Sequence, residues 1–106
     1  MRKPVKPKPR KRLPEDIALI ESILRRQFED ATVRRTNSLM LRVRIIDKRF
    51  RGLSKVARHE MVEPLIDQLP TELQEEIYFV VLLTPDEVTG SSMNEEFENP
   101  TPSLIA

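Results

Sequence analysis

Several residue types are missing or scarce in this sequence, and each absence excludes a class of protein. The 106 residues include no cysteine, so the chain can form neither disulfide bonds nor thiolate metal sites. With only one histidine in addition, a zinc site is excluded. No apolar run approaches the roughly 18 residues of a membrane span. The basic N-terminal residues lack the apolar segment of a signal peptide, so we expect a cytoplasmic protein that does not contact the membrane.

Charge of each sign is concentrated at one end of the chain. Residues 2–12 contain seven Lys or Arg and no acid, and residues 86–106 contain five acids and no base. The formal net charge of +1 therefore conceals a basic head, a nearly balanced middle and an acidic tail. Proline alternates with the basic residues of the head, and Ser, Asn, Glu and Pro dominate the tail. This composition predicts a disordered basic arm over 1–13, a folded domain over 14–87 and a disordered acidic tail over 88–106.

The folded segment begins with the patterns of a helix and a hairpin. Apolar residues spaced three and four apart form one stripe of a helix over about 14–28. Two strands follow, at 31–36 and 39–47, with turn-forming residues between them. In the second strand, Arg42 and Arg44 alternate with apolar residues, so we expect one buried face and one solvated face.

A second helix and a third strand complete the predicted domain. Ser54 is a suitable N-cap for a helix that continues to about residue 69, and Pro64 should kink or split it. The run from 77 to 83 is apolar on both faces, and a strand of this kind is covered on two sides. We expect helices on one side and a cover of unknown identity on the other. The element order α-β-β-α-β predicts an α+β domain with helices packed on one face of a three-stranded sheet.

Basic residues gather around Gly52, between the second strand and the second helix. We call this region the Gly52 edge, and define it by Lys48, Arg49, Arg51, Gly52, Lys55, Arg58 and His59. The N-terminal end of a helix presents unpaired N–H groups and a partial positive charge, so it suits a phosphate. The alternative is that the loop is a basic, solvated surface and that Ser54 only caps the helix. The sequence has neither the glycines of a P-loop nor a Gly-x-x-Gly clamp.

Arg58 and His59 each admit a structural and a functional interpretation. At about 100° per residue, Arg58 falls on the helix face that carries Met61 and Val62. A charged residue there either overhangs the core as part of a binding rim, or is paired and structural. His59 lies beside this stripe, where a histidine is more often a packing residue than a metal ligand. No acid is placed to orient His59 toward Ser54, so we predict no catalytic residue, no metal ligand and no cofactor.

The residues of the Gly52 edge also carry a family resemblance. Phe50-x-Gly52 followed by Arg58-His59 resembles the hallmark of the BolA family, a strand ending in Phe-x-Gly and then a helix with Arg-His. The preceding LRVRIIDKRF is similar to that family's second strand, and Thr84-Pro85-Asp86-Glu87 resembles the Thr-Pro-x-Glu that closes its third strand. The likeness covers about residues 15–87. It implies a KH-like α+β fold and a non-enzymatic regulator, either a DNA-binding transcription factor or a partner of monothiol glutaredoxins in iron–sulfur handling.

Two departures from the family pattern concern the iron–sulfur role. Members of the family carry a histidine at the start of the third strand, where this chain has Glu76 or Tyr78. They also have a longer loop between the first two strands that bears a His or Cys, whereas residues 37–40 include neither. We therefore expect this chain to ligate no cluster of its own.

Three hypotheses for the function follow. The leading one is binding of nucleic acid, with DNA rather than RNA as the expected ligand and with the basic arm and the Gly52 edge in contact with phosphates. The second is a protein adaptor that meets a glutaredoxin-like partner through the same edge. The third is that the arm alone binds. We also hypothesise a weak homodimer across the open face of the sheet, because the apolar residues of the third strand lack a predicted cover on that side.

Overall fold

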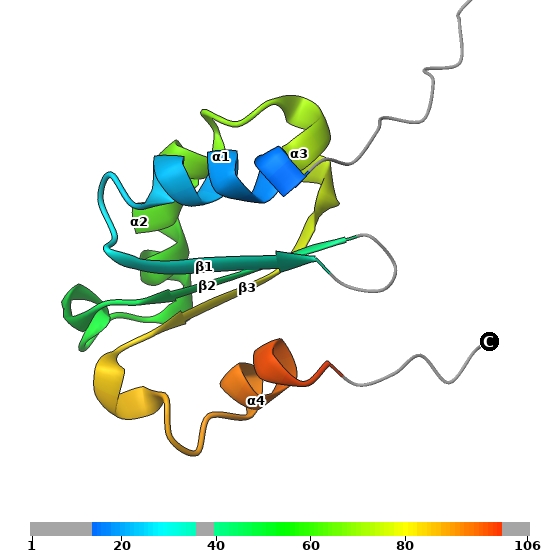
Figure 1. Cartoon of the computed structure of the whole chain (residues 1–106). Helices are drawn as coiled ribbons and strands as arrows, with labels where there is room; N and C mark the ends of the chain where they lie inside the picture. Colours follow the sequence, from blue (N-terminus) through cyan, green and yellow to red (C-terminus); the bar gives the residue numbers. More distant parts are fainter. Residues whose placement is uncertain (1–13, 36–39, 101–106) are drawn as a thin grey trace, which may run out of the picture.

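A three-stranded sheet lies at the centre of the molecule, with helices on both of its faces (Figure 1). The computed structural model describes residues 14–35 and 40–100. The predicted basic arm, 1–13, and the last residues of the predicted tail, 101–106, lie outside the described residues.

The strands follow the predicted patterns. β1 (Asp30–Arg35) and β2 (Leu41–Ile46) are antiparallel, and β3 (Ile77–Leu83) lies parallel to β2 on its other side. Alternation along β2 places apolar side chains on the inner face, where Val43 and Ile45 are completely buried. The predicted α+β fold with the order α-β-β-α-β is confirmed, and short helices are added before and after β3.

Three helices cover the inner face of the sheet: α1 (Pro14–Leu24), α2 (Lys55–Ile66) and α3 (Thr71–Glu76) (Figure 1). Their buried apolar side chains form one continuous core with the inner face of the sheet. At one end of this core the rings of Phe28 and Phe50 stack with their centroids 5.6 Å apart. This contact fixes the start of the Gly52 edge against the turn that follows α1.

The helices end earlier than predicted. α1 ends at Leu24 because the next residues form a tighter turn, in which the Gln27 N–H donates to the Leu24 carbonyl at 3.1 Å. Pro64 does not split α2, because the helical backbone hydrogen bonds continue beyond it. The Asp67 N–H, for example, donates to the Glu63 carbonyl at 2.9 Å. In the described part of the chain, no helix combines the length and the apolar composition needed to cross a membrane.

The outer face of the sheet is covered by α4 (Ser92–Glu98) (Figure 1). The prediction of a disordered tail beyond residue 87 is wrong for this segment. Ser91 caps the helix by accepting a hydrogen bond from the Asn94 N–H at 3.1 Å, and Phe97 is completely buried against Val81 and Leu83. α4 is thus the second cover that we expected for β3, and the helices are not confined to one face. The chain covers this face itself, so the reason for the proposed homodimer no longer holds.

Candidate functional site

The Gly52 edge begins with a tight turn that the local sequence explains. Asp47 caps the short 3₁₀ helix η1 (Lys48–Phe50) by accepting a hydrogen bond from the Arg49 N–H at 2.8 Å. Gly52 has a φ of 76°, in the left-handed region that favours glycine. Ser54 then caps α2, as predicted, and accepts from the Ala57 N–H at 3.1 Å. The turn therefore places the start of α2 beside the basic residues of the loop.

Arg49 and Arg51 both have acidic partners. Arg49 donates from Nε and Nη2 to the carboxylate of Asp47 at 3.0 and 2.8 Å, and its guanidinium lies 4.8 Å from the ring centroid of Phe28. The hydrogen bond from the Arg49 side chain lowers the pKa of Asp47. Arg51 pairs with Asp86 at 3.0 Å, but both side chains are largely exposed, at 72% and 68%. The two arginines thus differ, because Arg49 stabilises the turn through Asp47 whereas Arg51 remains accessible to a binding partner.

The contacts of Arg58 favour the structural one of its two interpretations. Its side chain is only 11% exposed and donates to the carbonyls of Leu53 and Leu82 at 3.0 and 2.9 Å. It also forms a bidentate pair with Glu87, at 2.7 and 3.0 Å. Hydrogen bonds from Arg58, and then from the backbone of Thr84, lower the pKa of Glu87 to about 2. Arg58 therefore joins α2 to the end of β3 rather than projecting from the edge.

The remaining residues of the Gly52 edge are exposed. Lys48 and Lys55 lie on either side of Gly52, and in the part of the chain that the structure describes neither side chain has a hydrogen bond or an ion pair. His59 is exposed on α2, one residue beyond Arg58. The structure thus brings the predicted residues together, but only some of their charges are available to a partner.

A pocket of about 450 Å³ lies beside this edge. Lys55 and His59 of α2 line one side, Val80 and Leu82 of β3 contribute apolar surface, and the loop before α4 completes it with Gly90 and neighbouring residues. The pocket combines a basic side with apolar surface, which suits a side chain of a protein partner as well as a small anion.

The donor set does not fit an iron–sulfur cluster. The chain has no cysteine, and its one histidine, His59, lies on α2. At the start of β3, Glu76 is ion-paired with Arg35 at 2.9 Å, and Tyr78 is 54% exposed. Among the residues that the structure describes, no group of three or more potential ligands could hold a metal ion. Clusters take thiolate and imidazole ligands, so a shared cluster would find too few of them here.

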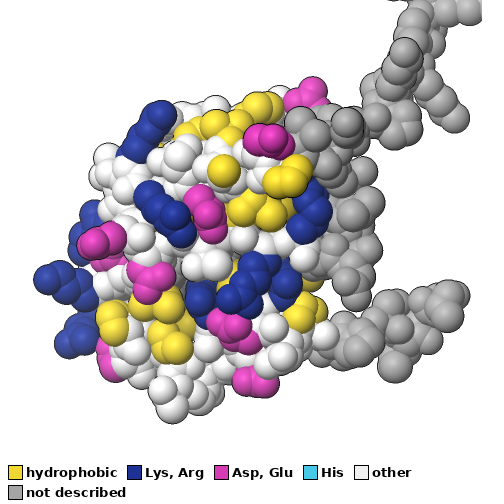
Figure 2. Space-filling view, in the orientation of Figure 1, with side chains coloured by type: hydrophobic (Ala, Val, Ile, Leu, Met, Phe, Trp, Pro, Cys, Tyr) yellow, Lys and Arg dark blue, Asp and Glu magenta, His cyan; other side chains and the backbone are white. Residues whose placement is uncertain are grey.

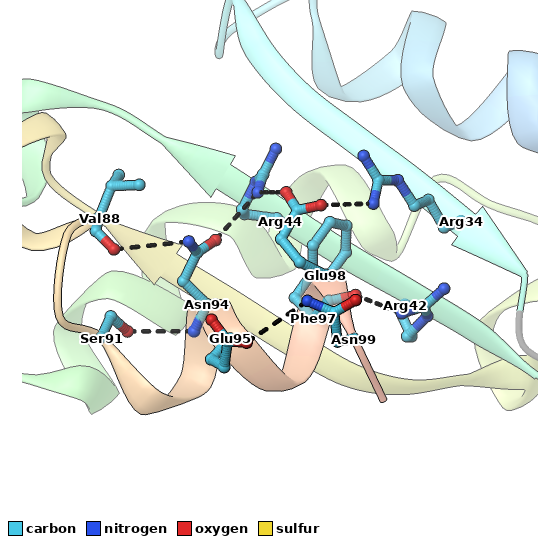
Figure 3. Close-up of polar contacts among 10 residues, drawn as sticks. All are labelled: Arg34, Arg42, Arg44, Val88, Ser91, Asn94, Glu95, Phe97, Glu98 and Asn99. Atoms are coloured by element: carbon cyan, nitrogen blue, oxygen red, sulfur yellow. Dashed lines mark hydrogen bonds and ion pairs between the residues drawn. The ribbon is translucent and has the colours of Figure 1, made fainter. Parts of the chain in front are cut away.

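Sequence reasoning missed a second group of charged residues, on the outer face of the sheet. Arg34, Arg42 and Arg44 project from β1 and β2 toward α4, where Phe97 and Glu98 contact them (Figure 3). In the space-filling view, Lys and Arg side chains gather between the strands and α4 (Figure 2). The alternation of Arg42 and Arg44 indicated a polar face, but the expectation that this face is solvated was wrong, because α4 packs on it and leaves Arg42 only 6% exposed. The available signal for its cover was the set of apolar residues in the acidic segment, Val88, Met93 and Phe97, which pack together with the end of β3.

Comparison with known proteins supports the fold. No protein-family model matches the sequence, and no curated protein matches it. Among solved structures, BolA1 from Arabidopsis thaliana is similar, with a TM-score of 0.53 at 21% sequence identity, over 71% of this chain and 98% of that chain. Nearly all of that chain has a counterpart here, whereas part of this chain has none there. The chain therefore has a BolA-like α+β fold, as the resemblance around Phe50-x-Gly52 and Arg58-His59 implied.

Proposed function

We propose that this protein is a non-enzymatic, BolA-like regulator that binds nucleic acid, with DNA rather than RNA as the expected ligand. In this proposal the basic arm of residues 1–13 supplies attraction that does not depend on sequence, and the Gly52 edge supplies the docked surface. The observation that carries the proposal is the exposure of Lys48 and Lys55, without acidic partners in the described part of the chain, beside the N-terminal end of α2.

Arg51 supports the same surface. Its ion pair with Asp86 is exposed on both sides, and exposed pairs of this kind are weak, so a phosphate can take the place of the carboxylate. Arg49 and Arg58 have a different part, because their guanidinium groups hold the turn and α2 in place through Asp47 and Glu87. The exposed Lys48, Arg51 and Lys55 are therefore the residues that we expect to contact phosphate.

Acidic residues near the Gly52 edge limit the affinity with which the edge alone can bind phosphate. Asp47, Asp86 and Glu87 each lie within 3.0 Å of a basic residue of the Gly52 edge. They reduce its net positive charge, and the edge by itself offers few free cations. We therefore expect the arm, with seven Lys or Arg, to provide much of the affinity and the edge to set where the domain docks.

A matched pair of charge reversals tests this proposal. Lys55→Glu alters the first residue of α2, where a glutamate favours the helix dipole, so the fold should be kept. Arg26→Glu makes the same change of charge at an exposed residue outside the Gly52 edge, whose side-chain contact is one hydrogen bond of 3.4 Å to Gln68. Binding of a fluorescent duplex should weaken about fivefold more for Lys55→Glu than for Arg26→Glu. Equal effects of the two reversals would show that the edge does not dock the duplex.

The pocket beside His59 favours a second function, that of a protein adaptor for a glutaredoxin-like partner. Its apolar surface, from Val80, Leu82 and Met93, has no use in phosphate binding. Titration calorimetry with a monothiol glutaredoxin at low and high salt tests this candidate. Binding that depends little on salt and is lost in a Met93→Asp variant supports the adaptor, whereas the absence of binding excludes it.

A further inference from the structure

The outer face of the sheet carries three arginines in one cluster, the arginine face (Arg34, Arg42 and Arg44). Arg34 of β1 lies directly opposite Arg42 of β2 in the register of the sheet, and Arg42 lies opposite Phe79 of β3. Phe79 packs on the same side as Phe97. Like charges directly opposite one another destabilise a pair of strands, so the sheet alone does not favour this arrangement. The arginine face requires a ligand of opposite charge.

α4 fills this role with an aromatic ring and one carboxylate (Figure 3). The guanidinium groups of Arg34, Arg42 and Arg44 lie 5.2, 5.4 and 4.7 Å from the centroid of the Phe97 ring. The carboxylate of Glu98 pairs with Arg34 at 2.8 Å and also with Arg44. These pairs lower the pKa of Glu98, the one with Arg34 most. A ring held among guanidinium groups with an anion beside it is the arrangement that a nucleotide base and its phosphate would form.

α4 supplies less negative charge than the positive charge of the three arginines of the arginine face. Glu98 is the one carboxylate paired with it among the described residues, and Arg42 donates instead to the backbone carbonyl of Phe97. Arg42 is only 6% exposed, and the Nε atoms of Arg42 and Arg44 are buried without a hydrogen-bond partner in the described part of the chain. A buried cation without a counter-charge is costly. The arginine face therefore has capacity for more anionic charge than α4 provides.

α4 can also detach from the sheet while the rest of the domain stays folded. It has seven residues, and a helix of this length is not stable on its own. Its buried anchor is Phe97, within a small cluster that is separate from the main core. The loop that connects it to β3 contains Gly90 at a φ of 85°. Short elements with few buried contacts open at a low free energy while the rest of a domain stays folded.

We propose that the arginine face is a second nucleic-acid site, specific for single strands, which α4 occupies in the structure. A base takes the place of Phe97 among the guanidinium groups and beside Phe79, and a phosphate takes the place of Glu98. A duplex does not fit this chemistry, because its bases are stacked on one another and cannot reach the guanidinium planes. The inference rests on the proposed function, which gives nucleic acid as the class of ligand. It assigns the binding of single strands to the arginine face, a different surface from the Gly52 edge.

The test compares two glutamates of the same helix. Glu98→Gln removes the carboxylate that pairs with Arg34 and Arg44, whereas Glu95→Gln makes the same change at an exposed residue that contacts Asn99. The probe is a fluorescent oligothymidylate of about 15 nucleotides, near the upper site size of a small single-strand-binding domain. Glu98→Gln should tighten binding about three- to fivefold more than Glu95→Gln, because the competing ion pairs are lost. In the wild type, hydrogen exchange of the α4 amides should accelerate when the oligonucleotide binds, while β2 stays protected.

The outcomes separate this site from the Gly52 edge. Equal effects of Glu98→Gln and Glu95→Gln, with α4 still protected in the complex, would overturn the proposal even if Lys55→Glu weakens duplex binding. Tighter binding by Glu98→Gln would support it even if Lys55→Glu has no effect and the edge fails. A poly-glutamate peptide that releases α4 when the oligonucleotide does not would show that the arginine face takes an acidic protein, which also contradicts the proposal.

Discussion

Arg58 and Glu87 form a bidentate ion pair, at 2.7 and 3.0 Å, between the first turn of α2 and the residues that follow β3. The same guanidinium donates to the carbonyls of Leu53 and Leu82. Four hydrogen bonds thus meet at one side chain that joins three segments of the chain. Such a residue stabilises the fold around the Gly52 edge, whatever the edge binds.

The first prediction concerns this stabilisation. Arg58→Ala should lower the free energy of unfolding by about 2 kcal/mol, because two carbonyls and one carboxylate lose their donor. Arg58→Lys should recover part of the loss, since an ammonium group cannot make the bidentate pair. Urea denaturation measures both, with Arg51→Ala as the control at an exposed pair. A loss for Arg51→Ala as large as that for Arg58→Ala would contradict the structural role.

The second prediction is a pH dependence. The pKa of Glu87 is lowered from 4.5 to about 2, chiefly by Arg58, so the folded state favours the ionised carboxylate. The stabilisation that the ionised carboxylate of Glu87 provides is complete above pH 4.5 and is lost as the pH falls toward 2. The difference in unfolding free energy between the wild type and Glu87→Gln should therefore shrink over this interval. A difference that does not change with pH would show that the carboxylate charge is not responsible.

The third prediction concerns the turn. Gly52 has a φ of 76° and nothing lies within 4 Å of the position a Cβ would take, so the penalty for a side chain comes from the backbone alone. Gly52→Ala should destabilise the protein by about 1 kcal/mol, and Gly52→Asn by less, because asparagine tolerates the left-handed region. Thermal denaturation of both variants measures the ranking. The reverse order would mean that the backbone conformation is not what selects glycine.

The fourth prediction concerns iron–sulfur chemistry. The chain has one histidine and no cysteine, and Glu76 is engaged by Arg35. Mixing the protein with a cluster-loaded monothiol glutaredoxin should therefore leave the visible spectrum of the cluster unchanged. A spectral shift that His59→Ala abolishes would show ligation by His59 and would favour the adaptor function.

Local patterns were sufficient to predict most of the fold. The alternation along β2 identified its buried face, and Ser54 identified the start of α2, since strand alternation and helix capping depend on neighbouring residues. α4 was missed because its polar composition is typical of a disordered tail. Its stability comes from Phe97, which is buried by residues that are distant in the sequence.

The candidate site could be located from the sequence, but its charge could not. The basic residues around Gly52 are close in sequence, so their clustering was visible. Asp86 and Glu87, which neutralise Arg51 and Arg58, are 35 and 29 residues away from them. Only the parallel pairing of β3 with β2 brings these acids to the same end of the sheet. Charges counted along the chain therefore overestimated the positive potential of the edge.

The salt dependence of duplex binding is the measurement on which the proposed function depends. If the arm and the Gly52 edge together neutralise about six phosphates, the logarithm of the affinity should fall with the logarithm of the salt concentration with a slope of about −5. Deleting residues 1–12 should reduce the slope and leave measurable binding, and adding Lys48→Glu and Lys55→Glu should remove what remains. A slope near zero for the full chain would contradict nucleic-acid binding by these surfaces. So would a folded variant that lacks both the arm and the two lysines and still binds the duplex as tightly as the wild type.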